Sequence, residues 1–245
     1  MQFPLNEVLI AKAHAIMAPR RDVYWIIGAA CAGKSTVCRR LADKTGIAVY
    51  DMDEHFYGSY MSCYRQERHP AAKTWFSAPN PLAWALSLSW EEFNALNRAA
   101  LAECLDLFAD DLTTDGERRL LVDGGITHPA VLTRVILPDN VFCIETTAAD
   151  RVRAWETAKD RAEMRSWVLA LPNAAAMWQK FLCFDEMIAQ TIAVESHECG
   201  IRTFPRDEAT SVDELANTIA AHFGVGSTQP PCEYRGLPQA SRREA

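Results

Sequence analysis

The sequence lacks several features that would assign it to a specialised class. No apolar stretch approaches the ~20 residues that a helix needs to cross a bilayer, and no secretory signal opens the chain. Internal repeats are absent, and the cysteines show neither a C-x-x-C pair nor the spacing with histidine that is typical of zinc sites. We therefore expect a cytoplasmic protein with no membrane contact and no structural metal site.

An excess of basic residues is also missing. The net charge is −7 and the isoelectric point is near 5.4, which argues against nucleic acid as the main partner. The eight cysteines are scattered, several within apolar runs, as expected for buried free thiols in a reducing compartment. With 245 residues, 49% hydrophobic and 23% charged, the chain can form one large domain or one domain with an insertion.

The most informative stretch has the spacing G-x-x-x-x-G-K-[ST] of a phosphate-binding P-loop. An apolar run at 22–27 precedes it and predicts a buried strand, and an amphipathic run at 35–44 follows it and predicts a helix that ends near Gly46. In this context, glycines let backbone N–H groups surround an anion at a helix N-terminus, and the lysine adds a full charge. The predicted nucleotide-binding residues are Gly28, Ala29, Ala30, Cys31, Ala32, Gly33, Lys34, Ser35 and Thr36.

Strands and helices are expected to alternate along most of the chain. Further strands are predicted at 47–50, 120–122, 141–144 and 201–204, separated by helical patterns, which favours a parallel sheet covered on both faces. The expected fold class is α/β, with a single domain over residues 1–224 and a disordered tail over 225–245. A helical, aromatic-rich insert over 54–118 and further helices from 147 interrupt the alternation. In the insert, 89–92 has the spacing of a capping box, and apolar residues at helical spacing continue from there to 108. The last of the later helices is expected from about 174 to 199, and a helix over 5–18 is expected to pack against the sheet edge.

Acidic side chains follow three of the predicted strands: Asp51 with Asp53, then Asp123, and Glu145. Because ligands of open parallel sheets bind at the carboxyl ends of strands, Asp51, Asp53 and Asp123 should meet the phosphates. Carboxylates at such a place can bind Mg²⁺ or accept a proton from a substrate hydroxyl. Asp51 and Asp53 lie two apart and would face the same way in an extended segment. The alternative for either is to cap the next helix, and for Asp123 to form a turn.

Together, the P-loop at 28–35, Asp51-Met-Asp53 and Asp123-Gly-Gly125 resemble the small P-loop kinases, especially shikimate-kinase-like and gluconate-kinase-like enzymes. The resemblance implies a P-loop NTPase fold of three α/β/α layers with sheet order 2-3-1-4-5. It also implies that Asp51 supports Mg²⁺, that Asp53 binds and deprotonates an acceptor hydroxyl, and that Gly124 and Gly125 contact substrate. It covers residues 22–53 and 119–224 and leaves 54–118 unmatched.

Enzymes of this family also close an arginine-bearing lid over ATP. Here the lid is expected over about 147–172, with Arg161 and Arg165 four apart on one helical face as candidates. Interleaved acidic residues give the alternative of an ordinary salt-bridged surface. Arg206, in the loop where such kinases rest the adenine, is a candidate to stack on it.

The insert is the expected acceptor-binding region. Its aromatic residues suit an organic acceptor, and Arg65 or Arg68 could hold an anionic group on it. The alternative is that the aromatics form the core of a helical subdomain and the arginines its surface.

The sequence thus predicts an enzyme that uses ATP and Mg²⁺ to phosphorylate a hydroxyl of a small metabolite. Lys34, Asp51, Asp53 and Asp123 are the expected catalytic group, and Ser35 with Asp51 or Asp123 the expected metal ligands. Two alternatives stay open: an acceptor that is a nucleoside, nucleotide or antibiotic, and a non-catalytic switch whose ATP state a partner reads. The acceptor, the preference for ATP over GTP and the oligomeric state are left open.

Overall fold

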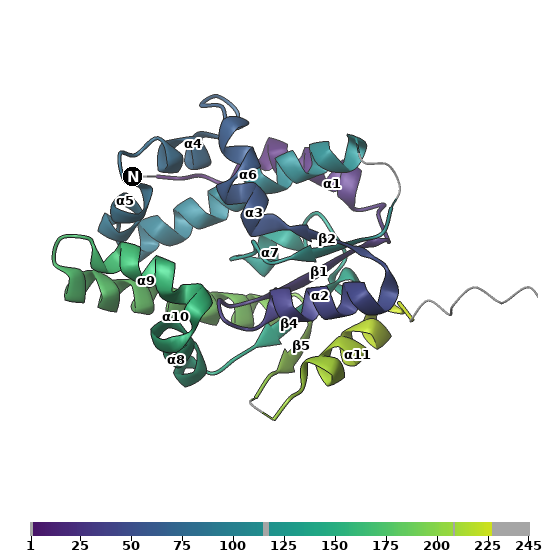
Figure 1. The fold of residues 1–245 in the computed structure, drawn as a ribbon. Coiled ribbons are helices and arrows are strands. Elements are labelled where there is room, and N and C mark those ends of the chain that lie inside the picture. Colours follow the sequence, from purple (N-terminus) through teal and green to yellow (C-terminus); the bar gives the residue numbers. More distant parts are fainter. Residues whose placement is uncertain (1, 115–117, 208, 227–245) are drawn as a thin grey trace, which may run out of the picture.

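A parallel five-stranded sheet forms the centre of the computed structural model, which describes residues 2–114, 118–207 and 209–226. The strand order is β2-β3-β1-β4-β5, as the resemblance implied, and every neighbouring pair is parallel (Figure 1). The strands are β1 (Val23–Gly28), β2 (Ala48–Asp51), β3 (Leu120–Asp123), β4 (Val141–Glu145) and β5 (Arg202–Pro205).

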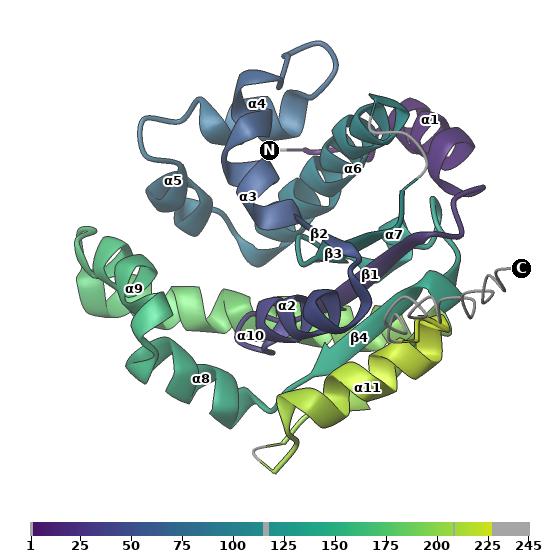
Figure 2. The same cartoon turned by 45° about the vertical axis from the view of Figure 1, so that its right-hand side comes forward.

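The three inner strands are apolar on both faces because helices cover both. Every residue of β1 is buried, and alternate side chains enter different clusters: Trp25 and Ile27 point to one face, Ile26 to the other. Helices α2 (Lys34–Thr45) and α11 (Val212–Phe223) cover the second face (Figure 2). The first face carries α1 (Glu7–Met17), α6 (Trp90–Thr114), α7 (Pro129–Leu132) and α10 (Ala174–Glu198). The α/β/α layers are those predicted.

The residues between β2 and β3 form a helical layer above one end of the sheet. Its elements are α3 (Met52–Tyr57), a 3₁₀ turn (Ser59–Ser62), α4 (Pro70–Phe76), α5 (Pro81–Ser87) and α6. The predicted capping box starts α6: Glu92 N–H donates to Ser89 Oγ at 3.2 Å, and Ser89 N–H donates to Glu92 Oε2 at 3.1 Å. Helix α1 packs along α6, whereas the sequence suggested the sheet edge.

Most aromatic side chains of the insert pack on one another. The Phe56, Tyr64, Trp75 and Phe76 rings form edge-on and stacked pairs with centroids 5.4–6.0 Å apart. This is the structural alternative considered for them, a core for the subdomain. Only Phe56 of these four also borders the cavity described below.

The segment after β4 contains three helices before β5. They are α8 (Ala148–Thr157), α9 (Ala162–Leu169) and α10, with 3₁₀ turns at Lys159–Arg161 and, before β4, at Pro138–Asn140. The long last helix was predicted over nearly the same residues. No helix in the described ranges is long and apolar enough to span a membrane.

The packed domain extends slightly beyond the predicted boundary at 224. Val225, assigned to the tail, is 2% exposed, and its N–H donates to the carbonyl of Ala220 at 2.9 Å, which closes α11 after Gly224. The rest of the predicted tail, from 227, lies outside the described residues. Among the described cysteines, Cys63 and Cys183 are exposed, so the expectation of burial holds for only part of the set.

Candidate active site

The predicted phosphate loop joins the end of β1 to the start of α2. Three residues have positive φ: Gly28 (144°), Cys31 (63°) and Gly33 (83°). A Cβ on Gly28 would lie 2.3 Å from the carbonyl oxygen of Ile144 in β4, so only glycine fits there. At Cys31 a residue with a side chain adopts the left-handed region, a strain that typically persists at functional sites. Strand, curled loop and helix occur in the order that the spacing predicted. The fold is that of the P-loop NTPases.

The side chains at the start of α2 are placed for anion binding. Lys34 Nζ donates to the carbonyl oxygen of Ala29 at 2.9 Å, folding across the loop. Ser35 and Thr36 are exposed in the first turn of α2, where unpaired N–H groups and the helix dipole favour negative charge. Their position suits a phosphate chain, as the sequence indicated.

Asp51 and Asp123 end two neighbouring strands side by side. The register of β2 and β3 pairs the two residues directly. Asp123 is 4% exposed, and its Oδ1 has no hydrogen-bond partner in the described part of the chain. Burial raises the pKa of Asp123, which the neighbouring Ser35 hydroxyl and Lys34 ammonium oppose. An orphaned buried oxygen beside a serine hydroxyl fits a magnesium ion or one of its waters.

Asp51 also serves the capping role that was the alternative for it. Its Oδ1 accepts the N–H of Glu54 at 2.9 Å, as N-cap of α3. Among the described residues no group of three His, Cys, Asp or Glu side chains could hold a metal on its own. A magnesium ion here would therefore rely on phosphate oxygens for several ligands, which is usual for nucleotide-bound Mg²⁺.

Asp53 lies in the first turn of α3 and not in an extended segment, contrary to the expectation. The side chain instead faces the loop after β3: a Cβ on Gly124 would lie 3.2 Å from Asp53 Oδ2 and 3.4 Å from Lys34 Cε. The glycine therefore lets the carboxylate and the lysine approach each other. Desolvation by the surrounding protein raises the pKa of Asp53. The negative charges of Asp51 and Asp123 raise this pKa further, whereas the positive charges of Lys34 and Arg161 lower it.

The second glycine of that loop is needed for packing. Gly125 has a φ of 71°, and a Cβ there would lie 2.2 Å from Met52 Cγ. Gly124, with a φ of 72°, borders the two polar side chains, while Gly125 lines the cavity beside them. The pair was predicted to contact substrate. Both glycines follow the carboxyl end of β3, and Gly125 borders the cavity, while a contact with substrate stays a prediction.

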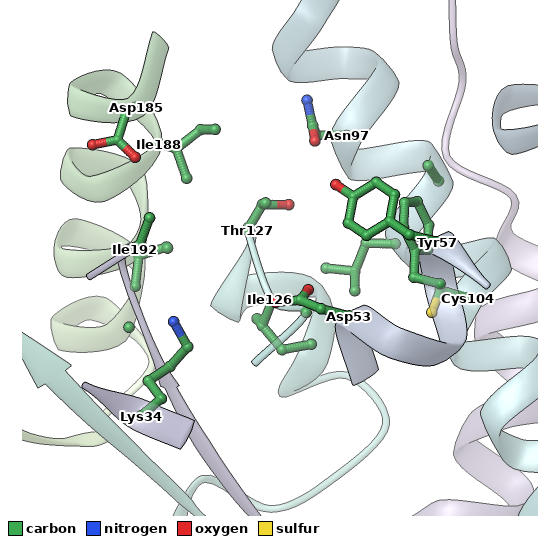
Figure 3. Close-up of a pocket in the computed structure, with 16 residues that line it drawn as sticks. Lys34, Asp53, Tyr57, Asn97, Cys104, Ile126, Thr127, Asp185, Ile188 and Ile192 are labelled. Carbon is green, nitrogen blue, oxygen red and sulfur yellow. The ribbon is translucent and has the colours of Figure 1, made fainter. Parts of the chain in front are cut away.

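A cavity of about 180 Å³ opens next to Asp53 and Lys34 (Figure 3). Helix α10 forms one wall, with Asp185, Ile188 and Ile192, and helices α3 and α6 form the opposite one, with Tyr57 and Asn97. The complete lining consists of Gly28, Ala30, Lys34, Asp53, Phe56, Tyr57, Asn97, Ala100, Leu101, Cys104, Gly125, Ile126, Thr127, Asp185, Ile188 and Ile192. It is large enough for a small organic molecule.

The two arginines predicted to hold an anionic acceptor do not line this cavity. Arg68 forms ion pairs with Asp106 and Asp110 of α6, at 2.6 and 2.8 Å. Arg65 is exposed in the loop before α4. Their alternative, a surface role, describes them better, because an arginine already held by two carboxylates has little to offer a substrate.

The lid candidates stack on tryptophans. Arg161 lies over the ring of Trp155 at 5.4 Å, and Arg165 over the ring of Trp178 at 5.8 Å. Arg161 also lowers the pKa of Asp53, so its charge reaches the site, whereas the exposed Arg165 donates to the carbonyl of Glu156 at 3.0 Å. The structure thus separates two residues that the sequence treated as a pair.

Arg206 contacts the phosphate loop from the other side. Its Nη1 donates to the carbonyl oxygen of Ala32 at 2.9 Å and occupies the space where a Cβ on Gly33 would lie, 1.7 Å away. Its predicted role was to stack on adenine; the observed contact is with the loop itself.

Several lining residues were missed by the sequence reasoning. Asn97 of α6 and Asp185 of α10 lie within helices whose apolar period was read as packing, so neither was considered a site residue. A polar side chain on a buried helical face was the available signal. Thr127, which follows the glycine pair, could have been included as part of the same strand end.

Comparisons with known proteins give little beyond the fold. No protein-family model and no curated protein matches the sequence. A solved structure of shikimate kinase from Acinetobacter baumannii in complex with shikimate is similar with a TM-score of 0.43 and 16% identity, covering 81% of this chain and 90% of that one. An uncharacterized protein from Eubacterium ventriosum has a TM-score of 0.35 and 12% identity, covering 83% and 98%. Likeness at this level says nothing of the activity.

Proposed function

We propose that this protein is a phosphotransferase that moves the γ-phosphoryl group of Mg²⁺-ATP to a hydroxyl of a small metabolite. One observation carries the proposal. Asp53 and Lys34 flank Gly124 and line the same cavity, so a carboxylate and the lysine of a phosphate loop face one space that can hold an acceptor.

The phosphate loop would hold the nucleotide. Gly28 and Gly33 allow the loop to curl, the first turn of α2 presents free N–H groups, and Lys34 can move from the Ala29 carbonyl to a phosphate oxygen. Bound Mg²⁺ supplies charge neutralisation on the phosphates, and Ser35 and Asp123, with Asp51 next to it, are the residues to hold it or its waters.

Asp53 would orient the acceptor hydroxyl and take its proton. Its raised pKa makes it a better base than an ordinary aspartate, because proton-transfer efficiency increases as the pKa approaches the working pH. Phosphoryl transfer needs mainly positioning and charge stabilisation, so few further groups are required. Arg161, whose charge reaches Asp53, is the lid residue best placed to stabilise the transferring group.

The cavity also bears on the alternatives. A nucleotide switch needs no enclosed space beside a carboxylate, so the cavity at Asp53 supports an enzyme. An acceptor that is a nucleoside or antibiotic would use the same scaffold and the same base, and differs only in what fills the cavity.

The test is coupled ADP release with Mg²⁺-ATP against a library of hydroxylated metabolites, nucleosides and aminoglycosides. We expect acceptor-dependent turnover that Asp53→Asn lowers by roughly 10²–10⁴-fold while ATP affinity is unchanged. Lys34→Ala serves as the blank. If Asp53→Asn kept full phosphoryl transfer, Asp53 would not be the base. Tight ATP binding with no acceptor-dependent turnover would favour the alternative of a non-catalytic nucleotide switch.

A further inference from the structure

The charges that line the cavity point to a particular class of acceptor. Among the described residues that border it, Lys34 is the one cation, and it belongs to the phosphate loop. Two carboxylates, Asp53 and Asp185, stand against it. The arginines that could have anchored an acidic acceptor are elsewhere, with Arg68 held by Asp106 and Asp110. An acceptor carboxylate or phosphate would find no cation among these lining residues except Lys34, which the phosphates of the nucleotide would engage.

Asp185 is the carboxylate that the proposed transfer leaves unused. It lies on α10, across the cavity from Tyr57 and Asn97 (Figure 3), and its side chain is 12% exposed. Burial of a carboxylate is unfavourable unless a cation or hydrogen-bond donors compensate for it. The attraction of Asp185 for a cationic ligand therefore depends on how much of its negative charge other side chains of the protein neutralise.

Trp155 and Arg151 both favour the charged form of Asp185, but Trp155 carries no charge and the one guanidinium serves two carboxylates, so the protein neutralises that charge only in part. Arg151 Nε lies 3.5 Å from Asp185 Oδ2, while its Nη2 pairs with Glu186 and its Nη1 donates to the carbonyl of Thr146 at 2.8 Å. The 3.5 Å contact is long for a charge-assisted bond. The three side chains carry a net charge of −1, and Asp185 is the one that borders the cavity.

The space between the two carboxylates is lined by apolar side chains and by the polar Asn97 and Thr127. Ile188 and Ile192 extend along α10 from Asp185, with Ile126 and Leu101 on the other sides. The ring of Tyr57 lies across from Asp185, with its hydroxyl end toward the cavity. A ligand that fits has an apolar body and a polar group at each end.

We propose that the acceptor is an amino alcohol: its hydroxyl is held at Asp53, its ammonium group at Asp185, and an apolar segment lies between the isoleucines and Tyr57. This rests on the proposed phosphotransferase function and names the chemical class that the site takes. Asp185 shares the guanidinium of Arg151 with Glu186. The ammonium group of the acceptor would give Asp185 a positive partner of its own. Phosphorylation transfers the γ-phosphoryl group to the hydroxyl oxygen, the hydroxyl proton goes to Asp53, and ADP leaves.

A binding measurement without turnover tests the class of acceptor separately from the phosphotransferase function. Two scaffolds, each with three end groups, are titrated by calorimetry into protein loaded with Mg²⁺ and the non-transferable analogue AMP-PNP. The first set is para-(aminomethyl)benzyl alcohol, para-(hydroxymethyl)benzamide and para-(hydroxymethyl)benzoate; the second is aminohexanol, hydroxyhexanamide and hydroxyhexanoate. We expect the amine of each set to bind roughly ten-fold or more tightly than the amide, and the carboxylate most weakly.

Asp185→Asn and Glu186→Gln form a matched pair of variants. Each removes one negative charge from the same arginine, but only Asp185 borders the cavity. Asp185→Asn should abolish the preference for the amine and leave binding of the amide unchanged, whereas Glu186→Gln should keep the preference. The inference would be overturned if both variants lost the preference for the amine to the same extent, or if the carboxylate bound more tightly than the amine. It would also be overturned if no ligand binding depended on Asp185.

Product analysis with Mg²⁺-ATP then tests the function. Phosphorylation of anionic alcohols alone would retain the phosphotransferase and reject the amino alcohol. Asp185-dependent binding of amines with no phosphorylated product would retain the cavity's preference and reject the transfer.

Discussion

Asp53 combines a proposed catalytic role with a cost to folding. Its pKa is raised by the surrounding protein and by Asp51 and Asp123, so the folded state favours the protonated form. A group whose pKa is higher in the folded than in the unfolded chain contributes less to stability as the pH rises through that interval. The charge that makes Asp53 a base is therefore a destabilising one.

We predict that Asp53→Asn is more stable to heat than the wild type at neutral pH, although it is inactive. The difference in Tm should grow as the pH rises from below the pKa of an ordinary aspartate through the raised pKa, and then level off. Thermal melts of both proteins across that range provide the measurement, and a Tm difference that stays the same at every pH contradicts the assignment.

The residues of the phosphate loop were predicted because their ligand is bound by one contiguous segment. Gly28, Gly33, Lys34 and Ser35 act through local backbone geometry, which spacing encodes directly. Asn97 and Asp185 lie on opposite walls of a cavity, on two helices far apart in the chain, and local spacing carries no trace of this. Arg68 was assigned to a substrate because its partners on α6 could not be seen in the sequence.

Helix α6 holds the insert to the domain through buried acidic residues. Glu103, 1% exposed, accepts the N–H groups of Ala71 and Ala72 at 2.9 and 2.7 Å, at the start of α4. Asp106 is fully buried: burial alone would raise its pKa, but hydrogen bonds from His69, Arg68 and Lys12 outweigh this and hold it well below its usual range. The sequence predicted α6 from the period of its apolar residues, but it did not indicate that Glu103 and Asp106 are buried and hold neighbouring elements.

We expect Glu103→Ala to lower the free energy of unfolding by about 2–4 kcal/mol, because it leaves two buried N–H groups without acceptors. Glu91→Ala is the matched control on the exposed start of the same helix and should change stability by less than about 0.5 kcal/mol. Urea unfolding at neutral pH measures both. Similar effects of the two substitutions would show that the α4 contact contributes little.

In the segment from α8 to α9, the two lid candidates Arg161 and Arg165 have different surroundings. We expect Arg161→Ala to lower kcat by roughly 10²-fold, the size typical of losing one group that stabilises transition-state charge. Arg165→Ala should change kcat by less than about three-fold, because Arg165 is exposed and stacks on Trp178 away from the cavity lining. Steady-state kinetics on the acceptor found in the library screen compares them. An equal effect of the two substitutions on kcat would support the sequence-based expectation that both arginines act in the lid.

At the scale of the molecule, the sheet brings together side chains from every part of the chain. Strand order followed from the family resemblance, and the strand positions followed from apolar runs, since inner parallel strands are buried on both faces. The arrangement of the insert could not be predicted, because its aromatics pack on one another through contacts that no periodicity specifies.

Nucleotide binding should stabilise the whole domain. At Mg²⁺-ATP one hundred times above its Kd, linkage adds about 2.7 kcal/mol. Each kcal/mol corresponds to about 2–4 °C in Tm for a chain of this size. The measurement is a melt with and without nucleotide, and Lys34→Ala should show little of the increase. An equal shift in that variant would place the nucleotide elsewhere.

The contact of Arg206 with the phosphate loop has a consequence for the order in which the protein is made. The guanidinium that braces Ala32 is 174 positions further along the chain and follows the edge strand β5. During translation the loop and its glycines leave the ribosome long before this brace exists. A nascent chain thus carries the whole motif in an unfinished form, and its nucleotide site is completed only after β5 and Arg206 have been synthesised.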